Sequence, residues 1–342
     1  MLAVVKEHQG PGFSLRDVPT PSLRYGDVLV RVRSVGICGS DVPILAGTRA
    51  VPWPLIPGHE FAGDVAEVGP GVDGFKAGDR VTSCLVIGCG NCRFCVSGAE
   101  NLCDHLVETG IHVNGAFAEY VRVPAKTLLK LRDGTSYDVG ASIDPVASAW
   151  RTVKALGSAL ISPLDTAVVF GPGPIGLYAA QLLKLRGACV ISVGADGDEA
   201  AGRLALASKF ADHVIDSSKE SVAERVAEIT NGRGADAVQD CTGAPPVVDC
   251  ALNVLRPCGT FAITGLFHRP VETNLGRITR AEIKVFGTIC YTRREFAECL
   301  EMVERGQVVT EPLVTHRFAL SEIDRAWEVI QAKRSIKIML HP

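Results

Sequence analysis

The stretch TAVVFGPGPIGLYAAQLLKLRG, residues 166–187, constrains the fold more than any other part of this 342-residue chain. A mostly apolar run precedes Gly171, Gly173 and Gly176, which have G-x-G-x-x-G spacing, and a helix-forming run follows them. This order predicts a strand, a tight turn and a helix, the unit that places a dinucleotide's diphosphate at a helix N-terminus. A plain glycine-rich turn is the alternative. The second strand, CVISVG, supplies the context that favours the dinucleotide unit.

The pattern around this unit changes along the chain. From about residue 148 to residue 287, apolar strands alternate with helical stretches expected at 175–186, near 200–210 and at 221–230, which predicts a parallel sheet covered on both faces. The first 145 residues instead carry short β-branched runs separated by Gly and Pro turns, which predict a mostly antiparallel, barrel-like domain. Amphipathic stretches at 294–304 and 321–332 and a strand, SIKIML, close the chain.

The second strand of the dinucleotide unit ends without the acid that usually binds the ribose 2′-OH. Gly194 stands there and leaves room for a 2′-phosphate, but Asp196, Asp198 and Glu199 follow, and the first basic residue is Arg203. The cofactor is therefore expected to be NAD or NADP, and the local charge leans towards NAD. The expected cofactor site comprises Gly171, Pro172, Gly173, Pro174, Ile175, Gly176, Gly194, Arg203 and Thr242.

Composition narrows the remaining possibilities. A net charge of -3 gives no electrostatic case for nucleic acid or an anionic membrane. The N-terminus has no secretory pattern, and the most apolar region is interrupted by Gly and Pro, so we expect a cytoplasmic protein that does not span a membrane. In that reducing compartment, clustered cysteines are more often metal ligands than disulfides.

Four of the twelve cysteines lie within fifteen residues, in the segment CGNCRFCVSGAENLC. Paired Cys-x2-Cys spacing lets tight turns present thiolates to one zinc ion, so Cys89, Cys92, Cys95 and Cys103 are expected to bind a structural zinc. Unligated thiols or a redox pair are the alternatives, and the segment lacks the thioredoxin-like context of a redox pair. Because all four ligand positions are filled, a catalytic metal has to bind elsewhere. Candidates for that open site are Cys38 in GICGSD and His59 with Glu60 in PGHEF.

Several motifs in order, VGICGSD, GHEFAGDVAEVGPGV, AGDRV, the four-cysteine segment, GAFAEYVRVP, GPGPIG and PLVTHRF, resemble the zinc-containing medium-chain alcohol dehydrogenases over essentially the whole chain. The polyol, sorbitol and threonine dehydrogenase branch is the most similar. The resemblance implies an α/β protein with a GroES-like catalytic domain at 1–145 and 289–342 and a doubly wound Rossmann-type domain at 146–288. It also implies a homodimer or homotetramer.

The resemblance also implies roles for individual residues. Relatives place the third protein ligand of the catalytic zinc within ASIDPVASAWRTV, usually as Glu in the polyol branch, where this chain has Asp144. We therefore expect Cys38, His59 and Asp144 as ligands, with Glu60 in the surrounding shell or as an alternate ligand. Asp144 could instead, or in addition, cap the following helix.

The remaining roles concern protons and substrate. By resemblance, Asp41 orients His59 and Ser40 accepts the proton of the alcohol. Pro43 replaces the relay histidine of relatives, so the proton leaves through water and ribose hydroxyls or another group such as His112. The implied function is oxidation of a polyol, sugar-type or other secondary alcohol with two zinc ions per chain. There are two alternatives. One is a zinc-free reductase of the same superfamily, and the other is a non-catalytic nucleotide sensor stabilised by a structural zinc.

Overall fold

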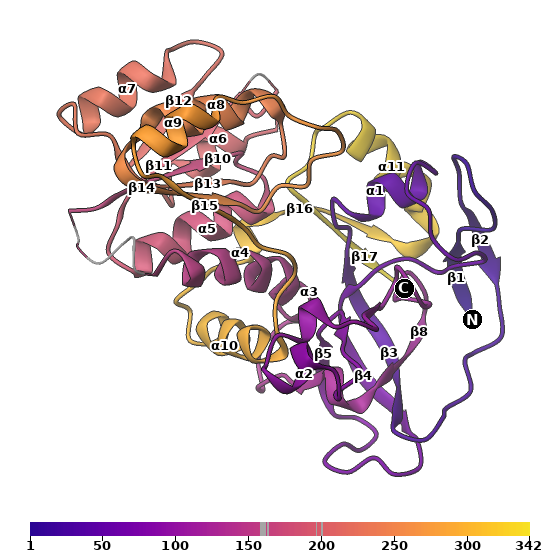
Figure 1. Cartoon of the computed structure of the whole chain (residues 1–342). Coiled ribbons are helices and arrows are strands. Elements are labelled where there is room, and N and C mark those ends of the chain that lie inside the picture. The colour runs from indigo at the N-terminus through magenta and orange to yellow at the C-terminus, as the bar shows by residue number, and fades with distance from the viewer. Residues whose placement is uncertain (158–161, 163, 196, 200) are drawn as a thin grey trace. The chain divides into compact units, whose positions relative to one another are not determined.

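The computed structural model describes residues 1–157, 162, 164–195, 197–199 and 201–342, and is shown as a ribbon in Figure 1. The chain forms two compact units. Unit 1 is discontinuous and comprises Met1–Asp144 and Tyr291–Pro342, whereas unit 2 is the intervening segment Pro145–Cys290. No helix among the described residues is long and apolar enough to cross a membrane.

Unit 2 is built on a six-stranded parallel sheet with the order β12-β11-β10-β13-β14-β15. Its strands are β10 (Thr166–Phe170), β11 (Cys189–Gly194), β12 (His213–Asp216), β13 (Ala235–Asp240), β14 (Leu255–Ile263) and β15 (Lys284–Gly287). Its helices are α5 (Pro174–Leu185), α6 (Arg203–Ala207), α7 (Val222–Ile229), α8 (Pro245–Val254) and α9 (Leu275–Arg280), and α4 (Ile143–Ala155) leads into it from unit 1. In Figure 1, α4 and α5 lie on one face of the sheet and α8 and α9 on the other. Both faces are therefore buried, which explains the continuous apolar runs of the central strands.

Unit 1 contains a seven-stranded sheet in which β3 pairs with β4, β8 and β17, and β4 with β5, all antiparallel. Two further two-stranded sheets are formed by β1 with β2 and by β6 with β7. The strands of unit 1 are β1 (Leu2–Val5), β2 (Ser14–Asp17), β3 (Asp27–Gly36), β4 (Glu60–Val68), β5 (Arg80–Ser83), β6 (Val86–Ile87), β7 (Val107–Glu108), β8 (Tyr120–Pro124), β9 (Leu128–Lys130), β16 (Val314–Ala319) and β17 (Lys337–His341). Its helices are α1 (Asp41–Leu45), α2 (Arg93–Val96), α3 (Tyr137–Ala141), α10 (Arg293–Glu304) and α11 (Ile323–Gln331), with short 3-10 turns η1 (Glu100–Leu102), η2 (Ala125–Thr127), η4 (Glu311–Leu313) and η5 (Leu320–Glu322).

The helices that the sequence predicts at 175–186, 221–230 and 294–304 are confirmed as α5, α7 and α10, each within one residue of the expected bounds. Local chemistry fixes these ends: the Ser221 hydroxyl caps α7, and Thr292 and Glu295 form a capping box at α10. The helix expected near 200–210 is shorter than predicted, since α6 spans Arg203–Ala207, and residue 200 lies outside the described residues.

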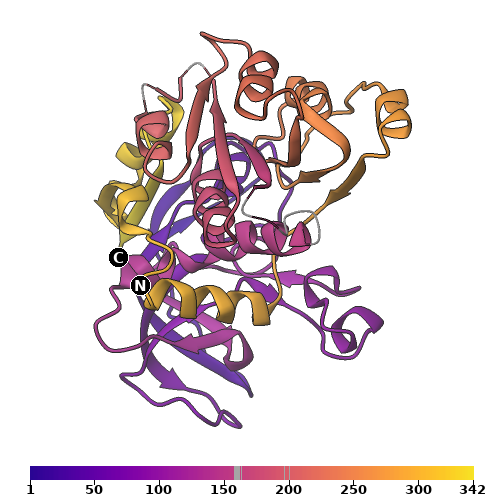
Figure 2. The ribbon, with the colours of Figure 1, turned by 90° about the vertical axis from the view of Figure 1, so that its left-hand side faces the viewer.

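Each unit has its own apolar core. In β3 of unit 1, Val28, Val30 and Val32 are buried while Arg31 and Arg33 are exposed, so one face of the strand packs inward. The two ends of the chain lie close together in both views of the ribbon (Figure 2).

A half-buried carboxylate ties the end of the chain to the sheet of unit 1. Asp138 in α3 accepts hydrogen bonds from Ser34 Oγ at 2.7 Å, Arg317 Nε at 2.7 Å and His341 Nε2 at 2.8 Å. Burial alone would raise the pKa of Asp138, but these three donors outweigh it and hold the pKa well below its usual value. The carboxylate is therefore a charged junction between β3, β16 and β17.

Unit 2 has a corresponding junction at Asp236 in β13, which is 1% exposed. Its carboxylate accepts from Arg256 Nε at 2.6 Å, from Arg233 Nη1 and Nη2 at 2.9 Å each, and from the Thr166 backbone N–H at 2.8 Å. These contacts satisfy both oxygens of a buried charge, as such groups require.

Candidate metal centres and active site

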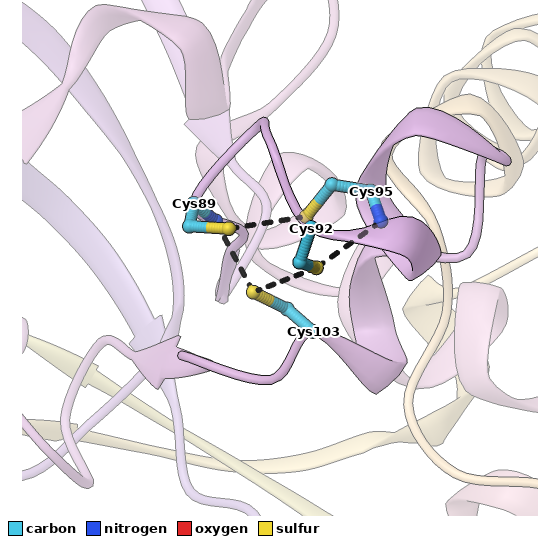
Figure 3. Close-up of side chains that lie close together, drawn as sticks. All are labelled: Cys89, Cys92, Cys95 and Cys103. Carbon is cyan, nitrogen blue, oxygen red and sulfur yellow. Dashed lines mark hydrogen bonds between the residues drawn. The ribbon is translucent and has the colours of Figure 1, made fainter.

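The four cysteines singled out in the sequence converge in one lobe of unit 1 (Figure 3). Cys89 Sγ lies 4.0 Å from Cys95 Sγ, and Cys92 Sγ lies 3.8 Å from Cys103 Sγ. Four sulfurs bound tetrahedrally to zinc at about 2.3 Å stand about 3.8 Å apart, so the spacing fits that ion. No open position would remain around such an ion, which makes this a closed, structural type of site.

Electrostatics of the lobe also fit a cation. Backbone N–H groups of Cys95 and Asp104 lower the pKa of the Cys92 thiol to about 6, which favours the thiolate that metals bind. The Gly90 backbone lowers the pKa of Cys95, but burial and the other three cysteines outweigh it and raise that pKa to about 12. Four neighbouring thiols therefore resist full ionisation by themselves, and a divalent cation would remove that repulsion.

The lobe is fastened to the rest of unit 1 by hydrogen bonds to backbone groups. Glu100 accepts from the Arg293 backbone N–H at 2.7 Å, where α10 begins. The Arg293 guanidinium donates to the Lys126 carbonyl at 2.6 Å, and Lys126 Nζ donates to the Gly88 carbonyl at 2.6 Å. Arg293, in the segment that returns from unit 2, and Lys126 thus connect the four-cysteine lobe to η2 and α10.

A second group of possible metal ligands forms where β3 and β4 meet. Gly36 pairs with Glu60 in the antiparallel register, so Cys38, just after β3, and His59, just before β4, are brought together. One ligand atom from each of Cys38, His59 and Glu60 lies within 4.8 Å of the other two. His59 and Glu60 are buried, whereas Cys38 is partly accessible. This group therefore offers three possible protein ligands and has a partly accessible side.

Asp41 and Ser40 lie on opposite sides of the His59 ring. Asp41 Oδ1 is 3.5 Å from His59 Nδ1, while its Oδ2 accepts from the Cys38 backbone N–H at 2.9 Å. Ser40 Oγ is 3.5 Å from Nε2. Burial lowers the pKa of His59, but the negative charges of Asp41 and Cys38 outweigh it and raise the pKa well above 6.5. The surroundings of His59 therefore stabilise positive charge.

Glu60 has a buried partner that the sequence analysis missed. Lys337, the first residue of β17, is 2% exposed, and its Nζ makes an ion pair with Glu60 Oε2 and donates to the Ile37 carbonyl at 3.1 Å. Burial lowers the pKa of Lys337, but the charge of Glu60 outweighs it and raises the pKa. Within the described structure Glu60 Oε1 is buried without a hydrogen-bond partner, as a carboxylate oxygen able to meet a cation would be. The sequence did contain one sign of this ion pair, a lysine inside the apolar run SIKIML.

Asp144 is not among the three residues of this group. Its Oδ2 accepts a hydrogen bond from the Tyr291 hydroxyl, a second partner that the sequence analysis missed. Burial raises the pKa of Asp144 to about 7, and the charges of His59 and Glu60 also act on it, so it lies near the group. The helix α4 begins at Ile143, which puts Asp144 inside the first turn rather than at the N-cap position considered above.

The other proton-transfer candidate of the sequence analysis, His112, has a local partner. Its Nδ1 accepts from the Glu108 backbone N–H at 3.1 Å and lies 3.6 Å from the Glu108 carboxylate, and its side chain is 44% exposed. These contacts hold the His112 ring beside the end of β7.

The glycine-rich turn of unit 2 has the geometry that a diphosphate needs. Gly171 has a φ of +89°, and a Cβ on Gly176 would lie 2.0 Å from the Gly171 carbonyl oxygen. A Cβ on Gly173 would meet no atom within 4 Å, so the backbone there borders open space at the start of α5. Pro172, Pro174 and Ile175 complete the turn and the first residues of α5. Packing thus requires glycine at positions 171 and 176, whereas Gly173 keeps the approach to the N-terminus of α5 open.

The neighbouring β13 turn is organised by a buried carboxylate. Asp240 Oδ1 accepts from the Thr242 backbone N–H at 2.7 Å and from its hydroxyl at 2.6 Å. A Cβ on Gly171 would contact Thr242 Cγ2 at 2.5 Å, so Thr242 lies directly beside the glycine-rich turn.

At the end of β11, Gly194 is followed by a tight acidic turn. Asp198 Oδ2 accepts from the Ala195 backbone N–H at 3.0 Å, and its Oδ1 lies 3.0 Å from Arg203 Nη1 in an ion pair. The predicted neighbour Asp196 lies outside the described residues.

Comparison with known proteins settles the family. Residues 24–133 match the alcohol dehydrogenase GroES-like domain, and residues 174–305 match the zinc-binding dehydrogenase domain. The chain is 37% identical to a sorbitol dehydrogenase of Halalkalibacterium halodurans, over 100% of this chain and 99% of that protein. It belongs to the zinc-containing medium-chain alcohol dehydrogenases. The D-arabitol-phosphate dehydrogenase of Enterococcus avium is 35% identical over 97% of this dehydrogenase and 95% of the relative.

Solved structures agree with this placement. An alcohol dehydrogenase from Thermus sp. ATN1 has a TM-score of 0.91 at 28% identity and covers 100% of this chain and 99% of its own. Galactitol-1-phosphate dehydrogenase from Escherichia coli has a TM-score of 0.90 at 27% identity, with 100% of each chain covered. The predicted family, its polyol, sorbitol and threonine branch, the GroES-like and Rossmann-type fold class and the dehydrogenase class are confirmed for this dehydrogenase.

Proposed function

We propose that this dehydrogenase reversibly oxidises a secondary hydroxyl of a polyol or sugar-type alcohol at a zinc ion held beside Cys38 and His59. The observation that carries the proposal is the group of Cys38, His59 and Glu60, which is separate from the four-cysteine lobe and offers fewer protein ligands. An incomplete protein ligand set of this kind is what a catalytic zinc requires, because substrate needs a coordination position. The named relatives that act on sorbitol and arabitol phosphate support the substrate class.

Cys38 and His59 would hold the metal together with an acid, Asp144 or Glu60. When bound, zinc supplies Lewis-acid activation of the alcohol and the nicotinamide accepts the hydride. Asp41 Oδ1, 3.5 Å from His59 Nδ1, is the group we expect to orient the ring, which would leave Nε2 for the metal. Ser40 Oγ, 3.5 Å from that Nε2, is the group we expect to take the proton of the substrate hydroxyl.

We propose NAD rather than NADP as the cofactor. Arg203, the first cation after β11, is already engaged with Asp198, and a carboxylate at this place repels a 2′-phosphate. All twelve cysteines are free of disulfides, which supports the proposed cytoplasmic location. A homodimer or homotetramer is proposed from the family alone.

Metal analysis with substrate kinetics tests the function. The purified protein should hold two zinc ions per chain, and Cys38→Ser should lose one of them together with turnover. Cys258→Ser, which changes an exposed cysteine of unit 2, is the matched control and should keep both. A Cys38→Ser protein that retains two zinc ions and still oxidises polyols would show that the catalytic assignment is wrong.

The substrate panel separates the remaining possibilities. It contains sorbitol, arabitol, threonine, arabitol phosphate and galactitol 1-phosphate, each with NAD⁺ and NADP⁺. If only the unphosphorylated compounds are oxidised, the substrate is a free polyol or amino alcohol. If only the phosphorylated compounds are oxidised, it is a polyol phosphate. If no compound yields reduced cofactor although two zinc ions are bound, the nucleotide-sensor alternative is favoured.

A further inference from the structure

Two buried acids lie near Cys38 and His59, and each is held by a different partner. Glu60 is paired with the ammonium group of Lys337, whereas the Asp144 carboxylate is held by the uncharged hydroxyl of Tyr291. An ion pair and a neutral hydrogen bond constrain a carboxylate differently. The hydroxyl fixes one oxygen without neutralising the charge that a metal ion would use.

Tyr291 is itself held rigidly. The side chain is 0% exposed, and its ring packs against Phe296 with the ring centroids 5.4 Å apart. The hydroxyl oxygen accepts from the Leu85 backbone N–H at 3.3 Å, so its single proton is directed to Asp144 Oδ2. Backbone on one side and an aromatic neighbour on the other thus determine where the carboxylate of Asp144 is bound.

The bond also joins the two chain segments of unit 1. Asp144 is the last residue of the first segment, and Tyr291 is the first residue of the second. The residues between them, Pro145–Cys290, are the whole of unit 2, yet the two side chains are in direct contact. The orientation of Asp144 therefore depends on correct docking of the returning segment.

We propose that Tyr291 is a positioning residue for Asp144, which sets how firmly this carboxylate contributes to the zinc site formed with Cys38 and His59. The inference rests on the proposed function. The aspartate side chain is short, so the orientation of the Asp144 carboxylate decides which atoms its second oxygen can reach. With Oδ2 held by Tyr291, the Asp144 carboxylate presents its other oxygen in a fixed direction.

Tyr291→Phe tests this role because it removes only the hydroxyl. We expect zinc affinity at the site to fall about 10- to 100-fold, the usual effect of losing a group that orients a ligand. Affinity is measured by competition with a chromophoric chelator, which does not depend on activity. The visible spectrum of the cobalt-substituted protein should change as well, because it reports ligand geometry.

The matched control is Tyr137→Phe. Tyr137 also lies in unit 1 and also donates its hydroxyl to a carboxylate, that of Asp64, which is not among the proposed ligands. This variant should lose stability but keep wild-type zinc affinity and cobalt spectrum. If Tyr291→Phe behaves like Tyr137→Phe, with unchanged metal properties, the positioning role is overturned.

Two further variants separate failure of the inference from failure of the proposed function. Asp144→Asn and the double variant with Tyr291→Phe should have equal zinc affinities, because Tyr291 acts through Asp144. Unequal affinities would overturn the inference even if Tyr291→Phe weakens zinc binding. If Cys38→Ser removes one zinc but Tyr291→Phe changes nothing, only the inference fails. If Cys38→Ser also retains two zinc ions, the proposed function fails.

Discussion

Substituting the glycines of the fingerprint one at a time separates a diphosphate site from a plain tight turn. Gly173→Ala adds a methyl group that meets no atom of the protein within 4 Å, at a φ of -76° and ψ of -177° that alanine tolerates. Gly176→Ala adds one that would lie 2.0 Å from the Gly171 carbonyl oxygen, far inside contact distance. The first change therefore alters only what can approach from outside, and the second alters the packing of α5 on β10.

The expected magnitudes follow from this geometry. For Gly173→Ala the loss of a good N-cap residue and the reduced freedom of the unfolded chain oppose each other, so the free energy of unfolding should change by less than about 1 kcal/mol. A methyl group that blocks one hydrogen bond to a charged phosphate costs about 1.5–3 kcal/mol, or about 10- to 150-fold in NADH affinity. Gly176→Ala should instead destabilise unit 2 by about 1–3 kcal/mol through overpacking.

Two measurements are needed. Circular dichroism monitors unfolding in urea, and fluorescence monitors the titration with NADH. Gly173→Ala should unfold like the wild type yet bind NADH more weakly, whereas Gly176→Ala should lose stability. A Gly173→Ala protein that binds NADH with wild-type affinity would refute the reasoning, because the open backbone at this position would then have no role in holding the diphosphate.

Three further predictions concern stability and the four-cysteine lobe. Asp138→Asn should lower the free energy of unfolding by about 2 kcal/mol at pH 7. Because the folded-state pKa of Asp138 is held below its usual value, this difference between wild type and variant should persist above about pH 5 and shrink as the pH falls below about 4, in urea titrations at each pH. Asp236→Asn removes a buried carboxylate that two partly exposed arginines contact and should cost about 3 kcal/mol in the same assay at pH 7, and a cost near zero would contradict that account. Cys92→Ser should remove one zinc ion and lower the thermal stability first; loss of hydride transfer with the fold and the other zinc intact would mean that the two sites are reversed.

Features determined by neighbouring residues could be predicted from the sequence. The helix α5 follows from an apolar strand, three spaced glycines and a helix-forming run, and β12 follows from the short run HVID. The four-cysteine lobe could be predicted because its spacing lies within one short segment, where turns determine which thiols meet. The helix expected near 200–210 departs from the prediction: α6 spans only Arg203–Ala207, and its N-cap residue, Gly202, has a φ of 70°.

Features that depend on distant residues could not be predicted in this way. Lys337 and Tyr291 lie 277 and 147 positions from the acids that they contact, and no local pattern identifies their partners. Lysine within an apolar strand and tyrosine before a helix cap are both common. Only the pairing of β17 with β3, and the return of the chain beside Asp144, give these two residues their roles.

Charge balance explains why these distant partners matter. The carboxylates of Asp41, Glu60 and Asp144 are at most 4% exposed, and Lys337 is the one permanent cation that contacts any of the three within the described part of the chain. Buried charges cost several kcal/mol each unless they are compensated, so three acids and a thiol beside one lysine and the His59 ring form a cluster with an excess of acidic groups. A divalent cation bound by Cys38 would reduce that imbalance, whereas replacing Lys337 by methionine would increase it. The same burial that makes this cluster costly to assemble is what makes it attractive to zinc.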